Sequence, residues 1–532
     1  MAGPSLRWAA GLGHGPFLPR PMERVRSLAA AAERGRRPWM LAAAASAAAL
    51  GAAVAVAAGR ETTLGLGVVA LSLVPLLAVA VGGLKRLLVA AALFDISLGI
   101  DAHFFYVEPL GDLGALGGLN VSVTTLALAC LYAAWLAEAL LTPWRATRPR
   151  LAGTTWALAY VGAVAVAALA ATNAMLAGFE LALLAQMLLL LVYLVSHLRG
   201  REDIVFAFWV LFVSAIVQSA VTVFTAVTHV IVHVGPISNA IDRSYMTGAI
   251  WRAGGTMGAP NLASSFFAML AAPALALVLT QRRSAFTTLA YATLVCSLVA
   301  LVVTRSRGGW LAFIVAAAIV VAVLALRGTL STRGLLTTLA AGALLAPLVV
   351  PVVLDRLQAY DGGALASRAP LSQMSWRMVQ DHPLLGVGPN NFAAVAPEYL
   401  TPDLSREWLY TVHNKYLLVW SESGSIALLA FLMFVLRGAW SAVAAVRGGD
   451  GLSSPLALGL GAGVIGHMAH MGYDIFNSRP VVQLLWVCIA LLAVLARGRV
   501  QVAAPRFRRA VAQALAPRPT YAAVPRAGGP LG

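Results

Sequence analysis

The chain has 532 residues, of which 60% are hydrophobic and 11% are charged, and its mean hydropathy is +0.82. A soluble globular domain carries roughly 25% charged residues, so these values exclude a water-soluble multidomain protein and indicate a polytopic membrane protein. The net charge of +17 would suggest nucleic-acid binding in a soluble protein. In a membrane protein, cytoplasmic Lys and Arg explain such a charge, so we expect no nucleic-acid partner.

Apolar runs long enough to cross a bilayer recur through most of the chain. Because a spanning helix needs about 20 apolar residues, the sequence predicts an all-α polytopic membrane protein with about 12–14 transmembrane helices. The predicted spans are residues 40–58, 63–83, 86–101, 119–141, 153–172, 175–196, 204–232, 260–280, 285–303, 309–326, 334–354, 415–436, 456–473 and 480–496. We therefore expect one group of helices within 40–200 and a second within 201–496.

The two ends of the chain differ from the apolar middle. Residues 1–39 are rich in Arg, Gly and Pro, and no pattern of a cleaved signal peptide follows them. Residues 497–532 are rich in Pro, Ala and Arg, and we expect this tail to be disordered and to rest on the headgroups of membrane lipids. Alternation of the predicted spans places both ends in the cytoplasm.

The distribution of Lys and Arg supports this topology. Every predicted cytoplasmic loop holds at least two basic residues, as the positive-inside rule requires. Two long outer segments, 233–259 and 355–412, nevertheless carry many cations. The second contains several Pro and Trp residues, so we expect a folded cap rather than a loose connection. The basic residues placed on the outer side are Arg60, Arg243, Arg252, Arg305, Arg307, Arg356, Arg368, Arg377, Arg406, Lys415 and Arg479.

The stretch WRAGGTMGAPN, residues 251–261, places Arg252 before three glycines and a helix that opens at Pro260. Glycines let backbone N–H groups approach an anion, and a helix N-terminus favours negative charge. An Arg beside that end indicates a phosphate or another oxyanion. The alternative from this stretch alone is a flexible turn whose Arg binds lipid headgroups.

The stretch TRSRGGW, residues 304–310, holds two Arg residues in a very short outer connection. If this turn is helical, Arg305 and Arg307 lie about 200° apart, so only one of them can face a shared site. We favour Arg307, because Gly308 and Gly309 would let a ligand come close. Binding of lipid phosphate is again the alternative.

The outer loop contains SRAPLSQMSWRMVQDHPLLGVGPNNF, residues 367–392. Its spacing predicts an amphipathic helix from about 369 to 381, followed by a turn at GVGPNN. We expect Asn390 and Asn391 to be the solvent-side cap of that turn. The helix would present Leu371, Met374 and Met378 to a core.

The stretch TVHNKYLLVWSESG, residues 411–424, places His413 where the outer loop enters the bilayer. A neutral histidine there can take a proton from a hydroxyl near neutral pH, and an interfacial histidine that binds headgroups is the alternative. Glu422 would lie on the opposite helix face and about 13 Å deeper, so we expect it to bond another helix. A carboxylate that orients His413 is expected in the loop, among Glu398, Asp403 and Glu407.

The sequence predicts neither a metal site nor a cofactor. His467, His470 and Asp474 would share a helix face, where we expect interhelical hydrogen bonds. No Asp-x-Asp pair occurs, although a metal-dependent transferase acting on a nucleotide sugar would usually need one. Guanidinium groups can neutralise a pyrophosphate leaving group instead. The cysteines lie in apolar runs without metal or disulfide spacing: Cys130, Cys296 and Cys488.

Taken in this order, the motifs resemble those of the O-antigen ligase and polymerase family of bacterial membrane glycan transferases. Arg252 through Asn261 is similar to the family's Arg, Gly and Pro-Asn segment. TRSRGGW is similar to its Ser-Arg-Gly motif, which puts Arg307 in the functional position. HNKYLLVWSESG resembles its His-Asn-x-Tyr-Leu motif, with His413 and Asn414 at the first two positions.

The outer loop adds a fourth similar motif. DHPLLGVGPNNF is close to the family's His-Pro-Leu-x-Gly-x-Gly motif, which contains Gly386 and Gly388. An Arg upstream of that motif in the family corresponds best to Arg368. The resemblance covers roughly residues 200–490, and the first 200 residues carry no motif of the family.

The resemblance implies transfer of a glycan from undecaprenyl pyrophosphate to an acceptor hydroxyl on a lipid or glycan, at the outer face of the bacterial inner membrane. Arg252, Arg307 and Arg368 would hold the pyrophosphate, and His413 would act on the acceptor. Asn261, Asn414, Gly386 and Gly388 would support them. Ligase, polymerase and protein O-oligosaccharyltransferase share these motifs. A flippase for lipid-linked sugars is the alternative from another class.

Overall fold

The structure is a computed structural model. It describes residues 73–141, 148–230, 246–247, 250–280, 284–358, 368–400 and 409–515 apart from residue 152, together with residue 232 and a few residues between 42 and 50. The chain divides into two compact units, Met1–Leu88 and Val89–Gly532. The sites discussed below lie in the second unit. Most of the predicted span 40–58 and the first part of the span 63–83, residues 63–72, lie outside the described residues.

The prediction of an all-α polytopic membrane protein is confirmed. By length and composition, eight of the described helices can cross a membrane, or up to ten if each of two bent pairs is counted as one span. The eight are α5 (Val123–Leu141), α8 (Ala174–His197), α9 (Arg201–Thr228), α10 (Pro260–Thr280), α11 (Ala285–Val303), α12 (Arg307–Leu326), α16 (Lys415–Gly448) and the part of α18 up to Arg497.

Further described helices are shorter, bent or, like α17, less apolar. They are α3 (Leu84–Leu98), α4 (Glu108–Asp112), α7 (Thr155–Ala167), α13 (Thr332–Gln358), α14 (Arg368–Asp381), α15 (Phe392–Val395) and α17 (Ser453–Met471), with the 3-10 turns η1 (Ala168–Ala170), η3 (Gly255–Met257) and η4 (Ala396–Tyr399). α18 (Arg479–Leu515) continues past the membrane-length part into the tail that the sequence predicted to be disordered.

One predicted span begins differently. Residues 119–122 were expected to open a helix, but they form strand β2 (Leu119–Ser122), which pairs antiparallel with β1 (Asp101–Phe104). Gly114 at φ +94°, together with Gly117 and Gly118, lies in the connection between the strands. The first part of that predicted span is therefore an outer hairpin, which we call the 101–122 hairpin. A second, smaller pair consists of β3 (Met246–Thr247) and β4 (Ile250–Trp251).

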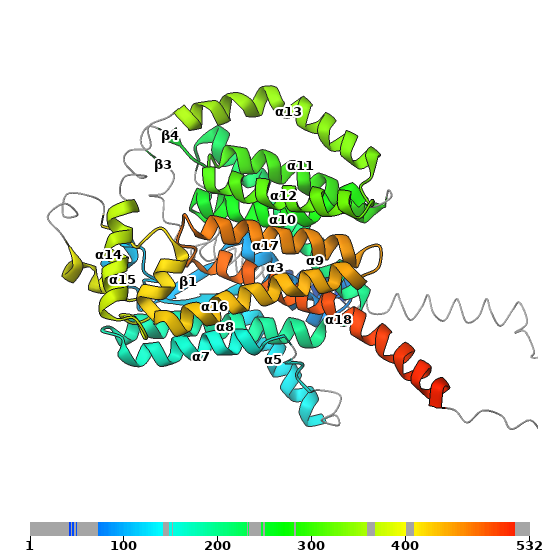
Figure 1. The fold of residues 1–532 in the computed structure, drawn as a ribbon, viewed down its shortest axis with the longest axis horizontal. Coiled ribbons are helices and arrows are strands. Elements are labelled where there is room, and N and C mark those ends of the chain that lie inside the picture. Colours follow the sequence, from blue (N-terminus) through cyan, green and yellow to red (C-terminus); the bar gives the residue numbers. More distant parts are fainter. Residues whose placement is uncertain are drawn as a thin grey trace, which may run out of the picture. The chain divides into compact units, whose positions relative to one another are not determined.

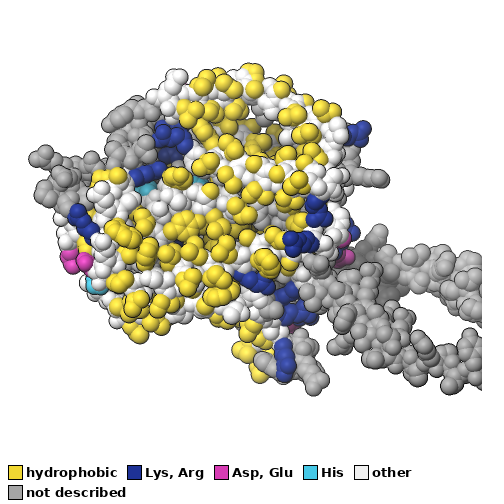
Figure 2. All heavy atoms as spheres, viewed as in Figure 1, with side chains coloured by type: hydrophobic (Ala, Val, Ile, Leu, Met, Phe, Trp, Pro, Cys, Tyr) yellow, Lys and Arg dark blue, Asp and Glu magenta, His cyan; other side chains and the backbone are white. Residues whose placement is uncertain are grey.

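Helix α10 is almost fully buried and packs against α11, α12 and α17. These helices run side by side in Figure 1, with α16 against the other side of α17. The glycines of α17 allow close approach: a Cβ at Gly459 would collide with the backbone of Pro273, and one at Gly466 with the carbonyl of Ala312. Small residues are the usual means of close helix packing in membranes. Figure 2 shows hydrophobic side chains along the lengths of the helices and Lys and Arg near their ends.

The outer loop has a core of its own at one end of the helices, where α14 and α15 lie together (Figure 1). The amphipathic helix predicted from about 369 to 381 is confirmed as α14, and it buries Leu371, Met374 and Met378. These side chains pack with Phe392 and Val412, among others. The described part of the outer loop is therefore folded against the start of α16.

Candidate functional site

Arg252 lies between β4 and the glycine turn that leads into α10, and it is 8% exposed. Its Nε donates to the carbonyl of Thr304 at 3.3 Å, and its Nη2 donates to Oδ1 of Asn261 at 2.5 Å. The turn is tight, because Gly255 and Gly258 adopt φ of +58° and +77°. Glycine reaches these angles without strain. The GGTMG sequence thus folds Arg252 back over the first turn of α10.

Asn261 connects three segments that are distant in sequence. Its Oδ1 also accepts a hydrogen bond from Oγ of Ser306 at 2.9 Å. Its Nδ2 donates to Oδ2 of Asp474 at 2.6 Å. Asp474 is 6% exposed and lies beyond the end of α17, which stops at Met471. Asn261 therefore fixes Arg252 relative to the N-terminus of α12 and to a buried carboxylate.

The two Arg residues of the TRSRGGW turn have different surroundings, and the turn is not helical at Arg305, where φ is +52°. Arg305 forms an ion pair with Asp355 at 3.0 Å. Arg307 is the first residue of α12, where Ser306 caps the helix. The role predicted for the following glycines is wrong: a Cβ at Gly308 would collide with the ring of His470, so this glycine makes room for a side chain of the protein and not for a ligand.

The pKa of Arg252 is lowered to about 10, mainly by burial and next by the charge of Arg356. Arg307 and Arg368 act in the same direction, whereas Asp474 raises the pKa. Cations that disfavour one another's charged form must lie near one another. The structure thus brings together Arg252, Arg307 and Arg368, and Asp474 is the one acid among the groups that act on Arg252.

Arg356 is a member of this cluster that sequence reasoning did not assign to the site. It is 4% exposed, near the end of α13, and its Nε donates to the carbonyl of Arg305 at 3.1 Å. Its position among the outer basic residues was the only signal in the sequence. We call Arg252, Arg307, Arg356 and Arg368 the arginine cluster.

His413 lies beside the arginine cluster, before the first turn of α16. Burial lowers its pKa, Asp474 raises it and Arg368 lowers it. Its ring centroid is 5.3 Å from that of Tyr410. Nδ1 of His413 is buried and has no hydrogen-bond partner among the described residues. A buried, neutral imidazole next to cations has the protonation state that a general base requires.

Among the described residues, the carboxylate that acts on His413 is Asp474, which was not one of those predicted, and the described Glu398 is not among the groups that act on it. Asp474 acts electrostatically on both His413 and His470, whereas Asp403 and Glu407 lie outside the described residues. Asp474 was also expected on the helix that carries His467, but the chain leaves that helix before it. The interhelical hydrogen bond expected for this stretch exists, since His467 Nδ1 lies 2.7 Å from Oγ of Ser265.

The HPLLGVGPNN segment docks on a break in α16. Gly424 has φ +78° within the helix, and the amides of Val387 and Gly388 donate to the carbonyls of Ser421 and Glu422, each at 2.9 Å. The Glu422 carboxylate accepts from the amide of Phe392 at 3.0 Å. Glu422 therefore bonds the short helix α15 of the outer loop rather than another membrane-spanning helix. The continuous helix predicted over 415–436 is interrupted at this point.

Gly386 and Gly388 serve this docking. A Cβ at Gly386 would collide with the backbone of Glu422, and φ at Gly388 is +106°. The solvent-side cap predicted at Asn390 and Asn391 is wrong, because these side chains are 4% and 0% exposed. They bond the backbone of residues 116, 173 and 176 instead. Asn414 caps α16 by accepting from the amides of Tyr416 and Leu417.

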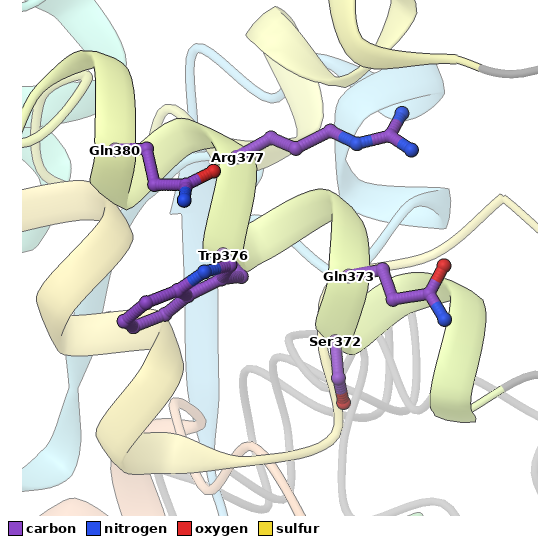
Figure 3. Close-up of a pocket in the computed structure, with 5 residues that line it drawn as sticks. All are labelled: Ser372, Gln373, Trp376, Arg377 and Gln380. Atoms are coloured by element: carbon purple, nitrogen blue, oxygen red, sulfur yellow. The ribbon is translucent and has the colours of Figure 1, made fainter.

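A shallow pocket of about 430 Å³ lies along the outer face of α14. Figure 3 shows Trp376 and Gln380 on one side of the helix and Arg377 and Gln373 on the other. The Trp376 side chain is 46% exposed and is held edge-to-face against Trp420, with 5.5 Å between the centroids. Amides, a guanidinium and an exposed indole offer hydrogen bonds and a stacking surface. The lining residues are Ser372, Gln373, Trp376, Arg377 and Gln380.

Comparison with protein families gives a match to part of the chain that carries this site. Residues 292–432 match the family model described as O-antigen ligase (Wzy_C). The family predicted from the motifs is thereby confirmed. The O-antigen ligase match includes Arg307, Arg356, Arg368 and His413, while Arg252 precedes it. It supports a membrane glycosyltransferase-like enzyme.

The other comparisons add little. No curated protein matches the sequence. Five chains of solved structures match. One of them belongs to a peptidoglycan synthase complex that coordinates polymerisation and crosslinking; it is 20% identical, with a TM-score of 0.36, and the match covers 66% of this chain and 99% of that chain. A likeness at this TM-score carries no argument about the site.

Proposed function

We propose that this protein transfers a glycan from undecaprenyl pyrophosphate to an acceptor hydroxyl at the outer face of the bacterial inner membrane. The observation that carries the proposal is the arginine cluster beside His413. Among the described residues, three guanidinium groups and one carboxylate, that of Asp474, act on Arg252, so cations outnumber acids in this set. A polyanion balances such an excess, and a lipid-linked pyrophosphate is the anion that a membrane glycan transferase releases.

In this mechanism, the arginine cluster binds the pyrophosphate and stabilises the charge that develops as the glycosidic C–O bond breaks. Guanidinium binds phosphate oxygens in bidentate fashion, so the leaving group can be neutralised without a metal ion. Arg252 is held in place by Asn261 and Thr304 before the donor arrives. Preorganised donors cost no reorganisation at the moment of reaction.

His413 takes the proton of the acceptor hydroxyl as the oxygen attacks the anomeric carbon. Attack opposite the leaving pyrophosphate inverts the configuration of that carbon. Burial lowers the pKa of His413, so its ring is neutral and able to accept a proton at neutral pH. The proton passes from the hydroxyl to the imidazole, and the electrons of the broken C–O bond leave with the pyrophosphate.

The glycan part of a substrate fits the pocket on α14. This helix begins at Arg368, so a chain that extends from the arginine cluster along the helix meets the pocket. The exposed indole of Trp376 can stack on a sugar ring, and Gln373 and Gln380 can bond its hydroxyls. We infer that α14 carries an oligosaccharide subsite.

Two alternatives concern the acceptor and one concerns the class of reaction. A polymerase uses a second lipid-linked repeat as acceptor, and a protein O-oligosaccharyltransferase uses a hydroxyl of a protein. A flippase would move the lipid-linked sugar without breaking a bond. It needs charged groups facing a passage through the membrane, whereas the cations described above gather where α10, α12 and α16 begin.

The test is transfer from a lipid-linked glycan in membranes that contain the wild-type chain, His413→Ala or Arg307→Ala. We expect both variants to accumulate and to lose transfer by at least about 10²-fold, the usual cost of removing a general base or an oxyanion donor. Near-normal product from well-expressed variants would contradict the mechanism.

A further inference from the structure

The 101–122 hairpin, which lies outside the residues matched by the family model, contacts the segment that carries His413. The amide and the hydroxyl of Thr411 both donate to the carbonyl of Leu113, at 2.9 and 2.8 Å. Nδ2 of Asn477 donates to the carbonyl of the next residue, Gly114, at 2.7 Å. The turn at residues 113–116 is thus hydrogen-bonded to Thr411, which precedes His413, and to Asn477, which follows α17.

A second set of bonds attaches the same turn to the docked outer loop. Oδ1 of Asn390 accepts from the amide of Leu116 at 2.7 Å, and its Nδ2 donates to the Leu116 carbonyl at 2.9 Å. One side chain therefore satisfies both backbone groups of Leu116. Buried polar groups paired in this way are costly to separate.

The base of the hairpin is fixed by a buried ion pair. Arg479, at the start of α18, contacts Asp95 at 2.8 Å and Asp101 at 3.1 Å, and its side chain is 1% exposed. Asp101 also accepts from Asn120 of the opposite strand at 2.7 Å. The 101–122 hairpin is therefore held by hydrogen bonds at its turn and by ion pairs at its base.

Tyr410 fills the space between this turn and His413. A Cβ at Gly114 would lie 2.8 Å from the Tyr410 ring, so the glycine at φ +94° leaves just enough room for the ring. On the other side, the Tyr410 ring contacts the ring of His413 in a tilted arrangement, with 37° between the ring planes. The order in space is Gly114, Tyr410, His413.

We propose that Tyr410, held by the turn at residues 113–116, is a positioning residue that keeps the His413 ring buried and oriented for proton transfer. This inference rests on the proposed function, because it assumes that His413 is the base. It gives the N-terminal part of the chain, which carries no motif of the family, a share in the reaction site.

The charged groups around the pair set the expected pH behaviour. His413 faces Asp474, from the segment after α17, and Arg368, at the start of α14. Tyr410 faces Asp474, Asp112 and Tyr106, and burial raises its pKa to about 12, so its hydroxyl stays protonated. Removal of the Tyr410 ring leaves Asp474 and Arg368 in place but exposes His413 to water. Its pKa, lowered by burial, then rises towards its ordinary value.

The experiment compares the pH dependence of transfer by full-length Tyr410→Leu, Tyr410→Phe and the wild type in proteoliposomes, with a lipid-linked glycan as donor. For Tyr410→Leu we expect the acidic limb of the pH–rate profile to move to higher pH, kcat to fall at least 10-fold and KM for the donor to stay within about 2-fold. Tyr410→Phe keeps the ring and should retain the wild-type limb. If Tyr410 only stabilised the fold, Tyr410→Leu would lower the rate without moving the acidic limb of the pH–rate profile.

A second variant tests the same idea without touching the ring. Thr411→Val removes one of the two bonds to Leu113 and should move the limb in the same direction by a smaller amount. This inference would be overturned if the acidic limb stayed at the wild-type pH in both Tyr410→Leu and Thr411→Val while His413→Ala was inactive. That result would leave the proposed function intact. Full activity of His413→Ala would contradict the proposed function and this inference with it.

Discussion

Asn261 accepts a hydrogen bond from Arg252 at 2.5 Å, between the first turn of α10 and the glycine turn before it. The same amide donates to Asp474, so the side chain links a cation of the site to its neighbouring acid. Such an arrangement fixes the guanidinium without letting the carboxylate neutralise it directly. The guanidinium of Arg252 is therefore held in a fixed position at the site.

Replacement of Asn261 by Leu should separate the two charged groups. The change leaves buried polar atoms of Arg252 and Asp474 without this partner, which costs about 1–3 kcal/mol for each such group. We expect transfer to fall more than 10-fold and the melting temperature in detergent to drop. Asn173→Ala, which removes a helix cap distant in sequence from these residues, is the control for general destabilisation. Equal activity of Asn261→Leu and wild type would contradict the role of the link.

The two Arg residues of TRSRGGW should differ sharply when each is replaced by Ala. Arg307 acts on Arg252, whereas Arg305 forms an ion pair with a half-exposed Asp355, which contributes little at a surface. We expect Arg307→Ala to lose transfer by about 10²–10³-fold, and Arg305→Ala to stay within about 3-fold of wild type. Initial rates at saturating donor measure this difference. A larger loss of transfer for Arg305→Ala than for Arg307→Ala would show that the pyrophosphate-binding role belongs to Arg305.

Replacement of Asp474 by Asn should shift the pH profile towards acid. Asp474 raises the pKa of His413, so loss of its charge lowers that pKa further. His413 then stays neutral at lower pH, so the acidic limb of the profile should move to lower pH. The maximal rate should fall, because Asn has one acceptor oxygen for the two donors, Asn261 and the amide of Ile475, that Asp474 serves. The pH–rate profile of Asp474→Asn against wild type tests the sign. A limb that moves to higher pH would contradict it.

The break in α16 should be intolerant of side chains. Gly424→Ala places a Cβ at φ +78°, against the carbonyl of Leu384, so docking of the outer loop is disturbed. The backbone angle alone costs about 1–2 kcal/mol. Gly178→Ala in α8 meets nothing within 4 Å and is the matched control. We expect a lower melting temperature and less transfer for Gly424→Ala only; equal thermal stability of the two variants would argue against the docking.

The pocket on α14 predicts an effect that depends on glycan length. Trp376→Ala removes the stacking surface, so KM should rise several-fold for the substrate with a long glycan and stay unchanged for one with a single sugar. Variation of glycan length first on the donor and then on the acceptor shows which of them occupies the pocket. A rise in KM that is independent of both lengths would indicate membrane anchoring by Trp376 rather than glycan binding.

The sequence predicted much of this arrangement because apolar periodicity and short motifs are local signals. The buried face of α14 and the grouping of Arg252, Arg307 and Arg368 could be anticipated in this way. Asp474 could not be placed, because its role depends on where the chain leaves α17. Arg356 carries no motif at all, and its place follows from how α13 ends.

The outer elements were harder still to predict. Leu119–Ser122 is apolar enough to continue the helix behind it, yet it pairs with β1 instead. The break at Gly424 is stabilised by carbonyl groups that accept from the loop some 35 residues earlier, a contact that no local pattern reveals. Asn390 and Asn391 read as turn residues, but long-range pairing buries them.

The most direct test of the account is product analysis with the purified wild-type protein in liposomes containing a defined undecaprenyl-pyrophosphate-linked glycan and a hydroxyl acceptor. We predict that free undecaprenyl pyrophosphate and the glycosylated acceptor form in equal amounts, that EDTA does not stop the reaction, and that His413→Ala forms neither product. Passage of the intact donor across the bilayer, without release of undecaprenyl pyrophosphate, would contradict the central claim.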